Sequence, residues 1–148
     1  MRRTIAIAWL VVLGGWASIA AGQSPGEPAA HEAVERFGHA LTSADTSLLK
    51  SLLPRRGKVQ LRLVRMGSYE GYFSPSQVEA LLRDFLDQGA VRSFRALRVE
   101  HDPGGVALAR TRLELTDRQG RPVSVEVRLA FQPEDGHWVL REIRETPS

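Results

Sequence analysis

The stretch GYFSPSQVEALLRDFL, residues 71–86, decides the fold, because a short aromatic strand runs directly into a capped helix. Ser74 is suited to the N-cap, Pro75 to the first helical position and Gln77 to the third, which together form a capping box. One helical face then carries an apolar stripe, and Gly89 is expected to end the helix; the stripe consists of Val78, Leu81, Leu82 and Phe85. This local chemistry predicts that the chain reverses at Ser74 and lays the helix across a sheet.

The residues before this stretch predict two helices and a strand. Apolar residues at helical spacing predict a helix over residues 31–43, and Asp45 or Thr46 caps a short helix that Pro54 ends. Residues 58–66 alternate between apolar and polar, which is typical of a strand with Val59, Leu61 and Leu63 on one face. Gly67 then turns the chain into the short strand that ends at Phe73.

The residues after the helix predict four strands, over 92–101, 106–116, 122–132 and 138–145. They are separated by DPGG, DRQG and PEDG, which are turn sequences of an antiparallel meander. The expected fold is therefore α+β, with three helices packed on a curved, mostly antiparallel sheet of about six strands.

The turns also predict how the last three strands pair. A three-residue loop at DRQG sets Leu113 opposite Val125 and Thr111 opposite Val127. The same loop at PEDG sets Phe131 opposite Val139 and Val127 opposite Ile143. Odd-numbered apolar residues then face the helices, and three opposite-charge pairs lie outside; these pairs are Arg112–Glu126, Arg128–Glu142 and Arg144–Glu126.

The N-terminus has the pattern of a secretory signal. Arg2 and Arg3 precede an apolar run and a series of small residues. We expect a signal peptide over 1–22, a disordered spacer over 23–30 and one domain over 31–146, with the protein in the periplasm or secreted. An uncleaved anchor is the alternative. Cleavage would remove two of the 20 cations and none of the 17 acids, so the working protein is nearly neutral.

The absence of cysteine excludes disulfides and lipid attachment at cysteine, so we do not expect a lipoprotein. After signal cleavage no stable membrane span is expected.

Two groups of residues are candidates for binding. The predicted register places Leu108, Ala130, Trp138 and Leu140 together on the outer sheet face, which predicts either a homodimer contact or ordinary surface scatter. Arg95 and Arg141 fall on the inner face. They are expected either to reach the rim or a helix carboxylate, or to anchor a small anionic ligand in a pocket with His101 and Tyr72 nearby.

The order of elements resembles the nuclear-transport-factor-2-like superfold, and more closely the small secreted bacterial family named domain of unknown function 4783. The residues that carry the resemblance are Phe37 and Leu41, followed by the segments GYFSPSQVE, LLRDFL, SFRALRVEH and GHWVLREIRE. It spans residues 32–145. The resemblance implies a cone-shaped fold and export, but it implies no chemistry.

Some members of the superfold are enzymes, such as ketosteroid isomerases and dehydratases, which need a cavity acid or base. In this chain the register turns Glu114, Glu126 and Glu142 outward, which leaves His101, Tyr72 and Asp84 as interior candidates without an Asp–His dyad. We therefore expect a non-catalytic binding or assembly module with no catalytic residue and no cofactor. An enzyme using a cavity acid or base is the alternative.

Metal and nucleic-acid sites are not expected. HEAVE at 31–35 lacks the second histidine of a zinc-protease helix. A basic segment contains Arg55, Arg56, Lys58, Arg62 and Arg65 with no acid nearby in the sequence. It predicts either a contact for an anionic cell-envelope component or a solvated strand face. Nucleic acid does not fit an exported protein of nearly neutral charge.

Overall fold

The computed structural model describes residues 26–88 and 91–147. This part of the chain contains three helices, which are α1 (Gly26–Ser43), α2 (Thr46–Ser51) and α3 (Pro75–Asp87). It also contains six strands, which are β1 (Val59–Leu63), β2 (Tyr69–Phe73), β3 (Val91–His101), β4 (Ala107–Thr116), β5 (Pro122–Glu134) and β6 (His137–Thr146). The order of helices and strands is the predicted one.

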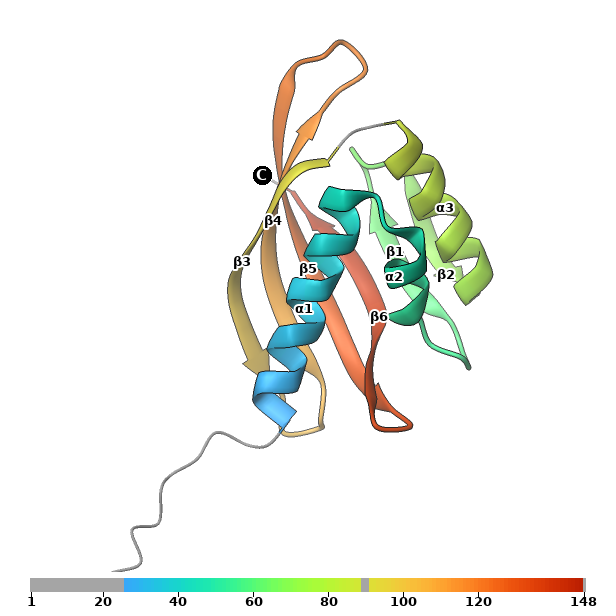
Figure 1. The fold of residues 1–148 in the computed structure, drawn as a ribbon, viewed down its shortest axis with the longest axis vertical. Coiled ribbons are helices and arrows are strands. Elements are labelled where there is room, and N and C mark those ends of the chain that lie inside the picture. The colour runs from blue at the N-terminus through green and yellow to red at the C-terminus, as the bar shows by residue number, and fades with distance from the viewer. Residues whose placement is uncertain (1–25, 89–90, 148) are drawn as a thin grey trace, which may run out of the picture.

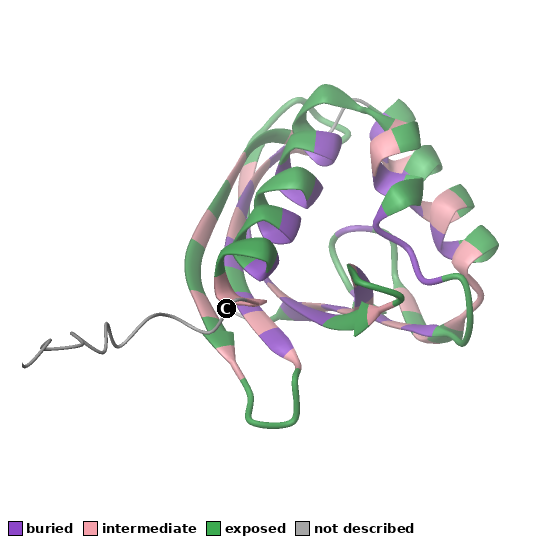
Figure 2. Ribbon diagram, turned by 60° about the horizontal axis from the view of Figure 1, so that its bottom comes forward, coloured by how far each residue is buried: buried purple, intermediate pink, exposed green. Residues whose placement is uncertain are grey.

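The six strands form one sheet in the order β2-β1-β6-β5-β4-β3. All neighbouring strands are antiparallel except β1 and β6, which are parallel. The helices lie on one face of the sheet and turn their buried residues toward it (Figures 1 and 2). Phe37 of α1 packs edge-on against Phe94 of β3 and Phe131 of β5, so the core lies between α1 and the sheet. The predicted α+β class is confirmed.

The reversal at Ser74 has the predicted capping box. The Gln77 backbone N–H donates to Ser74 Oγ at 3.3 Å, and the Ser74 N–H donates to Gln77 Oε1 at 2.9 Å. Val78, Leu82 and Leu86 are buried, whereas Leu81 and Phe85 are half-buried. The predicted stop at Gly89 lies outside the described residues. The local sequence therefore determines the start and direction of α3.

Helix α1 begins at Gly26, five residues before the predicted start. Residues 26–30, which were expected to belong to a disordered spacer, are helical because they contact the sheet: Ala30 is fully buried, and Glu27 lies 3.9 Å from His101 Nδ1. The predicted signal peptide and residues 23–25 lie outside the described residues. Among the residues that are described, no helix is long and apolar enough to cross a membrane.

Strands β4 and β5 pair in the predicted register. Leu113 faces Val125 and Thr111 faces Val127, and all four residues are buried. On the outer face Arg112 Nη2 donates to Glu126 Oε1 at 2.8 Å. This hydrogen bond is the main reason why the pKa of Glu126 is lowered, although partial desolvation opposes it.

The register predicted between β5 and β6 is wrong. The hairpin turns on Asp135 and Gly136 alone, with φ of 50° and 79°, so that Glu134 pairs with His137. Positive φ at both central residues is the geometry of the tight two-residue turn, in place of the expected three-residue loop. Further along, a bulge leaves Arg141 as an extra residue on β6. Ile143 therefore faces Leu129 instead of Val127.

The outer ion pairs reflect this change. Arg128 Nη2 still lies 3.0 Å from Glu142, as predicted, because the long side chain reaches diagonally. Arg144 contacts Glu142 at 3.3 Å instead of Glu126.

Glu145 near the end of β6 is a buried carboxylate that ties β6 to the end of β1. Its Oε2 accepts hydrogen bonds from the backbone N–H groups of Val64 and Arg65, each at 2.7 Å. The residue is 7% exposed, and Arg65 Nε lies 4.0 Å from Oε1. The carboxylate therefore holds the start of the β1–β2 turn against the sheet.

Replacing Glu145 should destabilise the fold. Glu145→Ala removes both charge-assisted hydrogen bonds, so the free energy of unfolding should fall by about 2 kcal/mol, and by less in Glu145→Gln, which keeps one acceptor oxygen. Urea denaturation measures the free energy of unfolding of both variants. The matched control is Glu32→Gln, which changes an exposed carboxylate on α1. Equal stability of Glu145→Ala and the control would contradict the role of this carboxylate.

Replacing Ser74 tests the cap of α3. Ser74→Ala removes the acceptor for the Gln77 N–H and should lower the free energy of unfolding by about 1 kcal/mol. Thermal and urea unfolding measure the loss. The control is Ser124→Ala, an exposed strand position; if both variants unfold alike, the capping box does not stabilise the helix.

Candidate functional site

A pocket of about 690 Å³ lies at one end of the sheet. Its walls are the C-terminal half of α3, the turn between β1 and β2, and the hairpin between β4 and β5, which meet at the top of Figure 1. Segments from three parts of the sequence therefore build it. The pocket is the candidate functional site because hollows of this size, about 300–1,000 Å³, are typical of small-molecule sites.

The inner wall of the pocket is apolar. Met66 and Leu115 are buried, and half-buried Tyr69, Leu81, Phe85 and Val123 complete it. The Tyr69 ring packs edge-on against Phe73, with ring centroids 6.4 Å apart. It also lies over Gly67, where an added Cβ would come within 2.5 Å of the ring and where φ is 141°. Glycine at this turn therefore allows an aromatic ring to form part of the wall.

Charged side chains surround the rim of the pocket. Arg65 and Arg118 are exposed cations, and Asp84 and Asp117 are the carboxylates. Among the described residues Asp84 has no hydrogen bond or ion pair, while Asp117 is engaged within its own hairpin. The rim therefore has two exposed cations, of which Arg65 is paired with Glu145, and two carboxylates, of which Asp117 is committed to its own hairpin.

Asp117 organises the β4–β5 hairpin. Its Oδ1 accepts from the backbone N–H groups of Arg121 at 2.8 Å and Gln119 at 2.9 Å, and its Oδ2 accepts from Arg121 Nε at 2.8 Å. The backbone hydrogen bond from Arg121 is the largest cause that lowers the pKa of Asp117; partial desolvation opposes it, and the side chain of Arg121 reinforces it. A carboxylate with a lowered pKa is a weak base, so Asp117 is a structural group of the pocket wall.

The four residues predicted to line a ligand pocket do not line this one. Tyr72 lies on edge strand β2 and is 66% exposed. Arg95 faces outward, opposite Arg112, and not inward near Thr111. The reason is that β3 contains register shifts on both sides of Arg95, so Phe94 and Ala96 take the inward positions.

His101 and Arg141 lie away from the pocket as well. The His101 ring is half-buried beside Trp138, with centroids 5.6 Å apart. Arg141 is the extra residue of the β6 bulge, and its guanidinium donates to the Arg56 carbonyl at 2.7 Å and to Glu134 at 2.8 Å. It ties the loop before β1 to the β5–β6 hairpin, which matches the structural alternative for this arginine and not the ligand anchor.

The predicted outer apolar patch is also divided. Leu108 and Ala130 pair on the outer face as expected, but Leu140 is fully buried in the core and Trp138 packs on the inner side against His101. The bulge at Arg141 causes this change, because one extra residue reverses the face of the side chains before it. Trp138 and Leu140 therefore cannot serve as an outer dimer contact.

The basic segment is not one patch in space. Arg55, Arg56 and Lys58 precede β1, whereas Arg62 and Arg65 lie at its far end, and all five are exposed. Acids approach two of them, since Arg62 lies 3.7 Å from Glu70 on the neighbouring strand and Arg65 lies 4.0 Å from Glu145 of β6. Only Arg65 reaches the pocket.

Besides Arg65, the sequence analysis named Asp84 as a candidate site residue, and Asp84 does line the pocket. The sequence analysis missed Tyr69, Met66 and Arg118, which are turn residues or adjoin turns. Turn sequences carry no periodic signal that indicates which other turn they will approach. Among the described residues no three His, Asp or Glu side chains lie close enough to hold a metal ion.

No family model and no curated protein matches the sequence. Several solved structures do match. A DUF4783 family protein from Bacteroides uniformis has a TM-score of 0.60 at 16% identity, over 77% of this chain and 95% of that chain. An NTF2-like design has a TM-score of 0.60 at 12% identity, over 79% of this chain and 96% of the design.

An LEH-like epoxide hydrolase from M. tuberculosis has a TM-score of 0.59 at 23% identity, over 82% of this chain and 84% of the hydrolase. These identities are low, so the likenesses concern the fold. They agree with the three helices and the open sheet described above. This chain has the nuclear-transport-factor-2-like fold, which DUF4783 family proteins share, and the expected resemblance is confirmed at that level.

Proposed function

We propose that this chain is an exported, non-catalytic binding module that takes a small, largely apolar ligand with an anionic group into the pocket beside α3. The observation that carries the proposal is the composition of the pocket. An apolar wall of Met66, Leu115 and the residues around them stands below a rim with two exposed arginines. Such a pocket stabilises the hydrocarbon part of a ligand by removing it from water, and the rim orients the charged end.

Arg118 is the rim charge that favours an anion, and Asp84 is the rim carboxylate that opposes one. Asp117 is neutralised locally by Arg121, so it opposes an incoming anion only weakly. Arg118 is exposed and makes no ion pair among the described residues, which leaves its guanidinium available for a ligand carboxylate. The anionic ligand expected from the sequence thus has support, but at a different set of residues.

The two pocket carboxylates favour a binding module over an enzyme that transfers a proton. An enzyme of this fold would need an acid or base whose pKa is tuned by burial or by a neighbouring charge. The pKa of Asp117 is lowered, and Asp84 is exposed. Asp84 is the residue that the enzyme alternative would have to use.

Export rests on the N-terminal signal pattern, which lies outside the described residues. Homodimerisation through the outer sheet face stays a prediction, now with Leu108 and Ala130 as its apolar residues.

The ligand proposal predicts preferential binding of an amphipathic acid. Calorimetry should detect decanoate binding and much weaker binding of decanol, which has the same chain without the charge. Arg118→Gln should weaken decanoate binding about fivefold by removing one partly exposed charge-assisted contact. Arg55→Gln, at the opposite end of β1, is the matched control and should bind decanoate like the unmodified protein.

A second variant tests the cavity itself. Val123→Phe adds volume inside the pocket and should abolish decanoate binding, whereas Leu108→Phe on the outer face should not. Equal affinity for decanoate and decanol would contradict the role of the rim, and binding that survives Val123→Phe would place the ligand elsewhere. Turnover of a bound compound that disappears in Asp84→Asn would support the enzyme alternative.

A further inference from the structure

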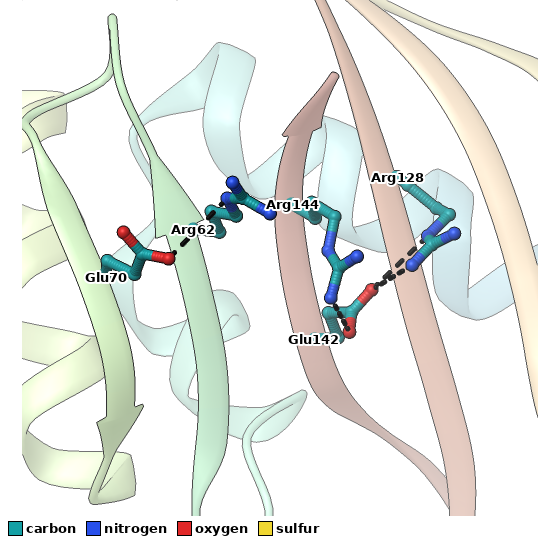
Figure 3. Close-up of polar contacts among 5 residues, drawn as sticks. All are labelled: Arg62, Glu70, Arg128, Glu142 and Arg144. Atoms are coloured by element: carbon teal, nitrogen blue, oxygen red, sulfur yellow. Dashed lines mark hydrogen bonds and ion pairs between the residues drawn. The ribbon is translucent and has the colours of Figure 1, made fainter. Parts of the chain in front are cut away.

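The outer face of the sheet carries a continuous row of arginines that crosses five strands. The strand pairing sets Arg98 of β3 opposite Arg110 of β4, Arg110 opposite Arg128 of β5, Arg128 opposite Arg144 of β6, and Arg144 opposite Arg62 of β1. We call these five residues the arginine row. Figure 3 shows three of them, Arg62, Arg144 and Arg128, side by side on neighbouring strands. The row was not apparent from the sequence, because its members are far apart in the chain.

Such a row is unfavourable in an isolated sheet. Like charges directly opposite each other on neighbouring strands repel and lower stability. Here four successive pairs have this arrangement, and strands about 4.8 Å apart give the row a length of about 19 Å. The arginine side chains are accessible, from 33% exposed at Arg144 to 68% at Arg98. A repeated unfavourable arrangement on an accessible surface suggests that the charges have an external partner.

Acidic side chains flank the row on both sides. Glu100 and Glu142 lie on one side and contact Arg98, Arg128 and Arg144, with 3.0 Å between Arg128 and Glu142. Glu126 lies on the other side, 3.4 Å from Arg110. Acids therefore border the row on the side of Glu100 and Glu142, and Glu70 closes its end opposite Arg62. On the other side Arg112 and Arg95 lie next to Glu126 and widen the cationic track.

The ion pairs of Arg98 with Glu100 and of Arg110 with Glu126 are accessible to solvent and contribute little to stability, so carboxylates of a partner can replace them. Glu142 is only 15% exposed, so Arg128 and Arg144 keep this partner and use their remaining N–H groups.

We propose that the arginine row binds a linear anionic polysaccharide whose carboxylates lie along the track. Guanidinium groups bind carboxylates through two parallel hydrogen bonds, and regularly spaced arginines match a polymer with one carboxylate on each sugar. The surface is distinct from the pocket beside α3, so this proposal does not depend on the proposed ligand site.

The surroundings of the row favour a single polymer chain over other polyanions. A flat anionic membrane would bring its charges against Glu100, Glu142 and Glu126 as well as against the row, and these contacts are repulsive. Proteins that bind single-stranded nucleic acid on a sheet stack bases on several aromatic rings. Along the described strands, Tyr72 at the edge is the only aromatic residue that the pairing places on the outer face.

The test uses a six-residue oligogalacturonate and the double variant Arg98→Gln with Arg110→Gln. Calorimetry at low salt should show binding to the unmodified protein, and the double variant should bind about tenfold more weakly. The matched control removes two cations from the helices on the opposite face, Arg36→Gln with Arg83→Gln, and should retain the original affinity. Binding should also weaken as the salt concentration rises. Thermal unfolding of each variant checks that the fold is kept.

Several outcomes would overturn the proposal. These are absence of oligogalacturonate binding, an equal loss in both double variants, or equal binding of an uncharged six-residue maltose oligomer. Tighter binding to phosphatidylglycerol vesicles or to a ten-nucleotide single-stranded DNA than to oligogalacturonate would assign the row to a membrane or to nucleic acid instead. Should the row variant unfold, the single variant Arg110→Gln, whose side chain is 63% exposed, replaces it with the same expected direction.

Discussion

The pairing of β4 with β5 is the constraint on which the rest of this structure depends. It places Leu113, Val125 and Val127 on the inner face, where α1 and the core cover them. A slip of one residue would turn every apolar side chain of the two strands into water. The same register determines the outer face, because Arg110 can oppose Arg128 only if Leu113 opposes Val125. The core and the arginine row are therefore two consequences of one set of backbone hydrogen bonds.

The bulge at Arg141 is the main departure from this regular arrangement. One extra residue on β6 reverses the faces of Trp138 and Leu140, so that both join the inner side of the sheet. The displaced arginine then contacts the Arg56 carbonyl and Glu134 and thereby connects two loops. The surface that alternation alone would make an apolar patch consequently keeps Leu108 and Ala130 but loses Trp138 and Leu140.

The pocket depends on contacts that hold two turns in place. Glu145 binds the backbone at Val64 and Arg65, and Asp117 binds the backbone of its own hairpin. Each carboxylate replaces hydrogen bonds that the turn backbone would otherwise make with water. Held in this way, the two turns and the end of α3 enclose a hollow whose wall is apolar and whose rim is charged. The arginine row lies on the other face of the sheet, so the chain presents two chemically different surfaces.

The sequence by itself determined the features that arise between neighbouring residues. The capping box at Ser74, the short helix after Asp45 and the β4–β5 hairpin all follow from side chains within a few positions of each other. Periodicity likewise predicted the fold class and most of the core, since burial must repeat with the geometry of each element.

Tertiary structure alone decided the pocket, the bulge and the arginine row. The pocket joins residues near positions 66, 85 and 118, and the row joins positions from 62 to 144. Which of two turns a hairpin adopts, and whether a strand gains one residue, depends on energy differences that packing across the sheet can reverse. In β6 this packing buries Leu140 and leaves Arg141 without an opposite residue in the strand register. No local sequence pattern predicts this outcome.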